Sequence, residues 1–97
     1  MTDVWPFDQE RNVAAVASRQ VVREGAVIRF VVHYSDDHSW AFLDSEHSES
    51  SDWLVVGMGT VAGKDPSLAQ IADLPPGWIA MRSSAGGPWT RQPDPDV

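Results

Sequence analysis

The sequence predicts an α+β fold, with a three- to four-stranded antiparallel sheet and one main helix packed on a face. Short apolar runs rich in β-branched and aromatic residues predict the strands. A polar turn between two of these runs is typical of a β-hairpin. One capped segment with a proline-rich stop predicts the helix. Because no βαβ spacing occurs, we expect antiparallel pairing.

The first half of the chain contains the hairpin. Residues 13–17 predict a strand of small apolar side chains, and residues 18–25 predict a helical turn ended by Gly25. Residues 26–34 alternate as a strand, residues 35–38 form a polar turn, and strand character resumes over residues 40–43. We expect Trp40 and Phe42 to share a face with the aromatic side chains Phe30 and Tyr34 of the first strand.

The second half alternates loop, strand and helix. Residues 44–52 predict a solvated loop and residues 53–58 a third strand. Asp65 and Pro66 are a typical N-cap and first helical position, and Pro75 and Pro76 end the helix. Residues 78–82 then predict a fourth strand. The organisation is an irregular N-terminal segment (1–12), a single α+β domain (13–91) and a flexible C-terminal tail (92–97).

Negative charge is concentrated in the middle of the chain. The net charge is −7, and residues 30–63 hold six acids and neither Lys nor Arg. Such a surface repels nucleic acids and anionic membranes and speeds encounter with a basic protein. The predicted binding site comprises these acids and the tryptophan that follows them: Asp36, Asp37, Asp44, Glu46, Glu49, Asp52 and Trp53.

Catalytic and metal-binding motifs are missing from the sequence. Without cysteine, the chain has no disulfide, thiolate ligand or cysteine nucleophile. His33, His38 and His47 lie near carboxylates, and His38 with Asp36 and Asp37 is an alternative zinc or manganese site, but the spacing matches no metal motif. Neither a nucleophile elbow nor a phosphate-binding loop occurs. We therefore expect no enzyme activity, no metal and no cofactor.

The five tryptophans have two expected roles. Trp40, Trp53 and Trp78 lie on or beside strands, which favours core packing. Trp5 and Trp89 lie outside regular elements, and they either staple the termini onto the sheet or remain exposed as interface anchors. The N-terminus lacks the features of a signal peptide and the apolar runs are too short to span a bilayer, so we expect a cytoplasmic protein.

Several short motifs together resemble those of one bacterial family. They are Asp36-Asp37-His38-Ser39-Trp40-Ala41-Phe42, the run 53–58, Asp65-Pro66-Ser67-Leu68, Leu74-Pro75-Pro76-Gly77-Trp78, Ala80-Met81-Arg82 and Trp89. The chain resembles the immunity-protein 33 domain family over about residues 5–91. The resemblance implies a cytosolic α+β domain that neutralises a toxin by occluding it.

Three functions remain open at this point. The first is a non-catalytic acidic protein-binding domain, an immunity protein among the options, whose partner has a basic surface. The second is a small structural or regulatory domain that forms a homodimer along an exposed hairpin edge. The third is a minor metal-binding protein or enzyme that uses His38 and nearby carboxylates.

Overall fold

Six strands, two α-helices and two short 3₁₀-helices make up the computed structural model, which describes residues 5–97. In chain order they are β1 (Ala14–Ser18), α1 (Arg19–Glu24), β2 (Phe30–His33), β3 (Trp40–Leu43), η1 (Ser50–Asp52), β4 (Trp53–Gly57), α2 (Met58–Lys64), η2 (Pro66–Ile71), β5 (Trp78–Met81) and β6 (Thr90–Pro93).

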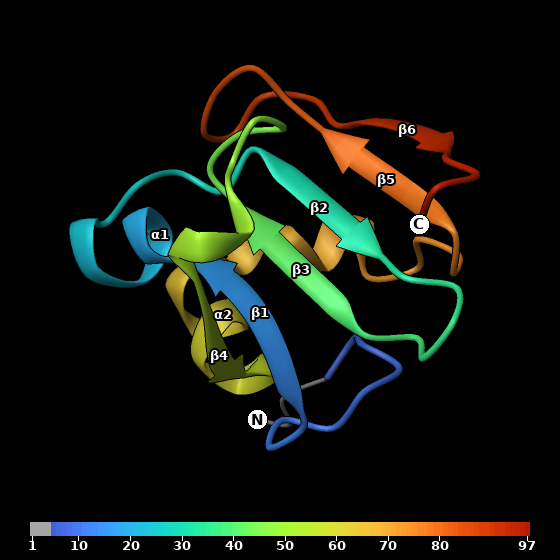
Figure 1. Ribbon diagram of the computed structural model, residues 1–97, viewed down its shortest axis with the longest axis horizontal. Helices are drawn as coiled ribbons and strands as arrows, with labels where there is room; N and C mark the ends of the chain where they lie inside the picture. Colours follow the sequence, from blue (N-terminus) through green and yellow to red (C-terminus); the bar gives the residue numbers. More distant parts are fainter. Residues whose placement is uncertain (1–4) are drawn as a thin grey trace.

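All six strands join one mixed sheet, in the order β4-β1-β3-β2-β5-β6 (Figure 1). The β2–β3 hairpin is confirmed, with Phe30 opposite Leu43 and His33 opposite Trp40. The expected three- to four-stranded antiparallel sheet is wrong, because β1 pairs with β3 in parallel and β6 adds a sixth strand. β3 lies between β2 and β1, and it runs antiparallel to β2 and parallel to β1.

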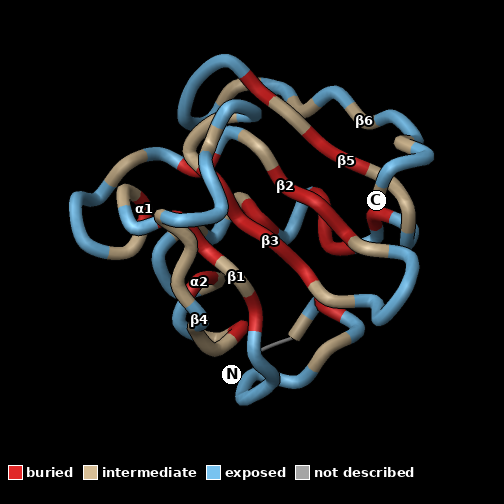
Figure 2. The backbone as a smooth tube through the Cα atoms, in the orientation of Figure 1, coloured by how far each residue is buried: buried red, intermediate tan, exposed pale blue. Residues whose placement is uncertain are grey.

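The two faces of the sheet are covered differently. The helices α1, α2 and η2 lie behind the sheet in Figure 1, and the buried side chains beneath them form the larger apolar cluster, which includes Trp40, Phe42 and Met58. Among residues 5–97, no α-helix covers the opposite face, beside which only the short η1 lies. The smaller cluster on this face consists of Val32, Ala41, Leu43 and Ile79 (Figure 2 shows the central strands buried). We call this second face the helix-free face.

The expected single main helix is also wrong. The segment that follows Asp65 is the 3₁₀-helix η2, although Asp65 caps it as predicted by accepting a hydrogen bond from Ser67 N. The two α-helices are α1, which runs from the Ser18 cap to Gly25 at φ 70°, and α2. The two glycines of α2, Gly59 and Gly63, lower its helix propensity, which is why the sequence pattern does not predict it.

The strand faces differ from the prediction at the hairpin. Trp40 and Phe42 lie opposite His33 and Val31 and point into the helix-covered core, whereas Phe30 and Tyr34 belong to the helix-free face. The aromatic residues of the two strands therefore occupy different faces. Trp40 stacks instead on the His33 ring, with ring centroids 4.0 Å apart.

Both terminal segments pack on the domain. Trp5 and Trp89 are half-buried against the main core cluster, and an arginine guanidinium covers each ring. Among residues 5–12 no helix or strand occurs, and residues 1–4 of the predicted N-terminal segment lie outside the described residues. The boundary expected between residues 91 and 92 falls inside β6. Among residues 5–97, no helix has the length and apolarity needed to cross a membrane.

A buried arginine connects three segments at one end of the sheet. The Arg82 side chain is 1% exposed, and it donates to Ile28 O, to Ser67 Oγ and to Asp65 Oδ2, the last at 2.6 Å. Burial alone would raise the pKa of Asp65. Hydrogen bonds from Ser67 and Arg82 outweigh it and hold the pKa below its usual value. The cluster fixes η2 against the start of β2 and the end of β5.

Replacing Asp65 by Asn should lower the free energy of unfolding by about 2 kcal/mol at neutral pH, because Arg82 would keep its buried charge without a counterion. The pKa of Asp65 is lowered by folding, so its contribution is complete above about pH 4 and disappears as the pH falls further. Urea denaturation of both proteins at about pH 7 and about pH 3 measures the difference.

Asp73→Asn is the matched control, since this carboxylate pairs with Arg91 but is 80% exposed. It should change stability by less than about 0.5 kcal/mol. Equal losses in the two variants would contradict a special role for Asp65.

Candidate functional site

The predicted acidic site is divided between the two ends of β3. Asp36 and Asp37 lie in the turn that precedes β3, and the other four acids follow it in the connection to β4 (Figure 1). An extended strand of this length separates its ends by roughly 10 Å or more. The six acids therefore do not form one contiguous surface. They form two separate groups, one at each end of β3.

The first group shapes the β2–β3 turn. Asp36 Oδ1 accepts from Asp37 N at 2.8 Å, and Asp37 Oδ1 accepts from Ser39 N at 2.9 Å. The hydrogen bonds from Ser39 lower the pKa of Asp37. His38, which lies between Asp37 and Ser39, adopts a φ of 60°, in the left-handed region that such turns require. These two carboxylates are occupied by their own turn, as in common Asx turns.

The second group includes carboxylates that are open to solvent. Asp52 is tied to α1, because it pairs with Arg19 at 3.2 Å and accepts from Gln20 Nε2. Glu46 and Glu49 are exposed, and Glu46 Oε1 lies 3.8 Å from Nε2 of the exposed His47 ring. Glu46 and Glu49 are thus the acids of the predicted site that are free to meet a partner. We call residues 44–52 the acidic loop.

Trp53 connects the acidic loop to the helix-free face. It is half-buried at the start of β4 and packs against the smaller apolar cluster. Its Nε1 donates to Ser48 Oγ at 3.1 Å, which holds the loop above the sheet. Trp53 therefore lies beside the acidic loop in space as well as in sequence.

A hollow of about 570 Å³ lies between the acidic loop and the β5–β6 connection. Phe30, Met81 and Pro88 provide its apolar lining, and Asp44, Glu46 and His47 line the loop side. One oxygen of Asp44, Oδ1, is buried without a hydrogen-bond partner in the structure. Arg29 and Arg82 also line the hollow, so its rim carries charges of both signs. Glu46 is the exposed carboxylate on this rim, and an apolar lining beside it suits a side chain with an apolar stem and a cationic end, such as lysine or arginine.

Tyr34 marks the other end of the helix-free face. Burial raises the pKa of its phenol, and the charges of Asp36 and Asp37 raise it further. The ring stays neutral and packs against the smaller cluster, as do the half-buried Phe30 and Met81. The helix-free face is therefore an apolar surface with acids at both ends.

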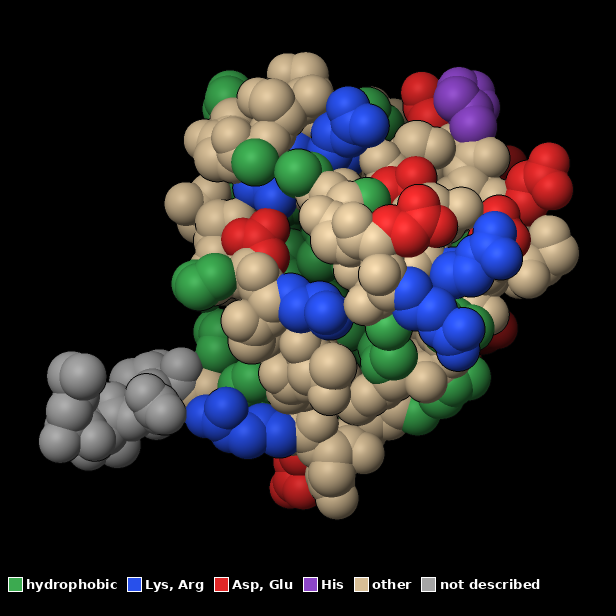
Figure 3. Space-filling model, turned by 90° about the vertical axis from the view of Figure 1, so that its left-hand side faces the viewer, with side chains coloured by type: hydrophobic (Ala, Val, Ile, Leu, Met, Phe, Trp, Pro, Cys, Tyr) green, Lys and Arg blue, Asp and Glu red, His purple; other side chains and the backbone are tan. Residues whose placement is uncertain are grey.

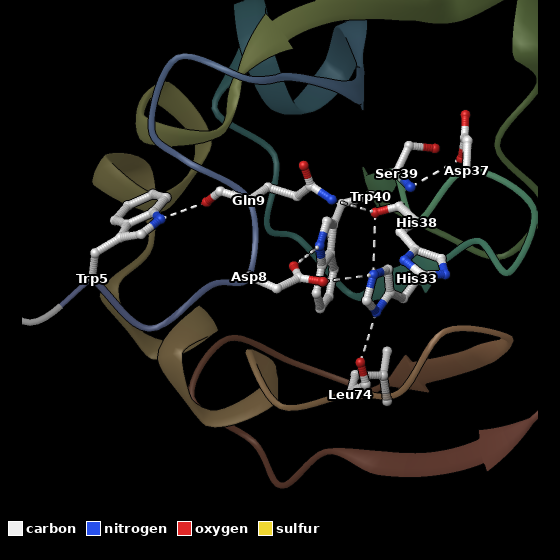
Figure 4. A network of polar contacts seen from close by, with 9 residues as sticks. All are labelled: Trp5, Asp8, Gln9, His33, Asp37, His38, Ser39, Trp40 and Leu74. Atoms are coloured by element: carbon white, nitrogen blue, oxygen red, sulfur yellow. Dashed lines mark hydrogen bonds and ion pairs between the residues drawn. The ribbon is translucent and has the colours of Figure 1, made fainter.

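The histidines do not form the alternative metal site. His33 is 2% exposed and uses both ring nitrogens: Nδ1 lies 2.7 Å from Leu74 O, and Nε2 lies 3.2 Å from His38 O and 3.4 Å from Asp8 Oδ2 (Figure 4). All three neighbours are oxygen atoms of the protein, so neither ring nitrogen of His33 is open to a metal ion. His47 is at the opposite end of β3. Among residues 5–97 no three metal-ligating side chains gather.

The network around His33 was not anticipated from the sequence. Asp8 also accepts from Trp40 Nε1 at 3.0 Å, and Gln9 Nε2 donates to His38 O at 3.0 Å, so residues 8 and 9 hold the N-terminal segment against the hairpin (Figure 4). The sequence signal was strand alternation, which places His33 on the same strand face as Val31. The network has a structural role, because the side-chain nitrogens of His33 and Trp40 contact oxygen atoms of the protein.

Comparisons with known proteins provide no relative: no family model matches this chain, and no curated protein or solved structure matches it either. The resemblance to the immunity-protein 33 family therefore rests on the short motifs quoted above and remains a prediction.

Replacing Asp8 by Ala should lower the free energy of unfolding by about 1–3 kcal/mol, because the buried Trp40 N–H loses its acceptor and His33 loses its carboxylate. Chemical denaturation followed by tryptophan fluorescence measures the loss. The exposed Glu10 provides the control, since Glu10→Ala should change stability by less than about 0.5 kcal/mol. A neutral Asp8→Ala variant would show that the network does not fasten the segment.

Proposed function

We propose that this chain is a non-catalytic protein-binding domain that takes a basic partner on the helix-free face, beside the acidic loop. The observation that carries the proposal is the position of Glu46 and Glu49. They are exposed next to a half-buried tryptophan and an apolar-lined hollow. Interfaces commonly combine an aromatic anchor, an apolar centre and a charged rim.

Binding is favoured over catalysis by what the polar side chains already do. Both nitrogens of His33 face protein oxygens, Asp37 holds its turn, and Asp65 holds Arg82. A general acid or base needs a group free to reach a substrate proton. The exposed acids instead offer a charged surface, which accelerates encounter with a partner of opposite sign.

A toxin with a basic cleft is the partner class we favour, and the cytosol is the proposed compartment. The excess negative charge supports a basic partner, and the resemblance to the immunity-protein 33 family supports a toxin. The lack of cysteine suits a reducing compartment. The alternative of a homodimer along the hairpin edge loses its basis, because β2 and β3 each have a neighbouring strand on both sides.

Reversing the charges of the two exposed glutamates should weaken binding of the partner. We expect Glu46→Lys combined with Glu49→Lys to weaken binding at least 10-fold at physiological salt, since two attractions become repulsions. Immobilised wild type and variant are used in parallel on extracts of the source organism. Each protein retained by wild type alone is then purified and titrated by calorimetry.

The control has the same change of net charge elsewhere. Glu24→Lys with Asp96→Lys alters exposed residues outside the acidic loop and should weaken binding less than about 3-fold. A third variant, Asp36→Lys with Asp37→Lys, tests whether the two acids of the β2–β3 turn contribute to binding. Equal losses in the first two variants would reduce the effect to net charge and contradict a site at the acidic loop.

A further inference from the structure

The two edges of the sheet are built very differently. β6 is protected as natural edge strands are, by Pro93, which has no N–H, and by the charged Arg91. β4 has neither proline nor charge, and its pairing with β1 runs without a bulge from Ser18–Trp53 to Ala14–Gly57. An unprotected edge of this kind is a template for another strand.

The backbone of β4 directs hydrogen-bonding groups outward at its centre. Met58 N donates to Val13 O at 2.9 Å, so this pair is a hydrogen-bonded one. Hydrogen-bonded and non-bonded pairs alternate along antiparallel strands. The pair of Val16 with Val55 is therefore non-bonded, and the N–H and C=O of Val55 point away from β1. Trp53 N–H is already satisfied by Ser50 O.

The side chain at the same position is unusually exposed. Val55 is 76% exposed, against 39% for Val27 and 36% for Val13, the other exposed large hydrophobic residues of the described part. β-branched side chains gain stability from cross-strand neighbours on the same face. Val55 has such a neighbour only on the β1 side.

Local charge decides which occupant fits this edge. The net charge of −7 would keep two copies apart at most surfaces. The β4 side carries charges of both signs, because Arg19 and Arg23 of α1 and Lys64 at the end of α2 lie there together with Glu24 and Asp52, and Figure 3 shows Lys and Arg side chains distributed across it among acidic ones. This side would not attract a basic partner, and it presents little repulsion to a second copy.

We propose that a second copy of this chain pairs its β4 with this β4, antiparallel and around a two-fold axis at Val55. The N–H of each Val55 donates to the C=O of the partner's Val55, and the sheet continues across both molecules.

Sedimentation equilibrium between about 1 µM and 1 mM tests the pairing. The expected mass rises from 10.7 kDa towards twice that value, with a dissociation constant on the order of micromolar because a single edge is a small interface. Val55→Asp opposes two carboxylates across the axis and should weaken association at least 10-fold. Thr90→Asp, on the exposed β6 edge, should leave it unchanged.

A single introduced thiol tests the register. Because the chain has no cysteine, Val55→Cys introduces a single thiol, which oxidised glutathione can convert into a disulfide between two copies. Hydrogen-bonded antiparallel pairs hold Cα atoms about 5.5 Å apart, which suits a disulfide. We expect covalent dimers from this variant and at least 10-fold fewer from Thr90→Cys.

A mass of 10.7 kDa throughout the concentration range would overturn the proposal. So would a dimer that survives Val55→Asp, or equal cross-linking at the two positions. None of these outcomes bears on partner capture by the acidic loop, so the two proposals fail independently. Circular dichroism of each variant checks that it is folded.

Discussion

The Arg82 guanidinium is the interaction on which the arrangement of this domain depends. It is buried at the end of β5, and its donors are shared between the chain that enters β2 and the cap of η2. A buried cation adds little net stability, but once buried it strongly penalises any packing that leaves it unpaired. The side chain therefore acts mainly by selecting one arrangement. It fixes where η2 lies, and with it the helices that cover one face of the sheet.

Because the helices cover one face of the sheet, the helix-free face is covered by loops. Half-buried side chains such as Phe30 and Met81 complete the helix-free face, and Trp53 anchors the acidic loop beside them. The core on this side is shallow, so its rim remains near solvent. An apolar surface with carboxylates at its rim results from this asymmetry, and it is the physical basis of the proposed binding site.

Several local signals were read correctly from the sequence, whereas the helix α2 and the non-local strand pairings were not. The hairpin, the Ser18 and Gly25 limits of α1 and the Asp65 cap follow from residues a few positions apart. The parallel β1–β3 pair depends on tertiary packing, which no periodicity encodes. β6 carries a polar sequence with a proline, tolerated because the strand lies at an edge.

The candidate site followed the same rule. A run of acids along the chain suggested one surface, yet β3 separates its two halves, and hydrogen bonds commit Asp37 and Asp52 to local structure. The position of Trp53 next to the acidic loop is a local relation and was found. The contacts of Asp8 with His33 and Trp40 join distant segments and had no signal beyond strand alternation.

The parallel pairing of β1 also has a consequence for synthesis. Both neighbours of β1 in the sheet, β3 and β4, come later in the chain, so β1 is synthesised before either of them. A nascent strand with two open edges is prone to pair with other chains. The sequence of β1 limits this risk, because three of its five residues are the small Ala14, Ala15 and Ala17. These side chains expose little apolar area before the partner strands are synthesised.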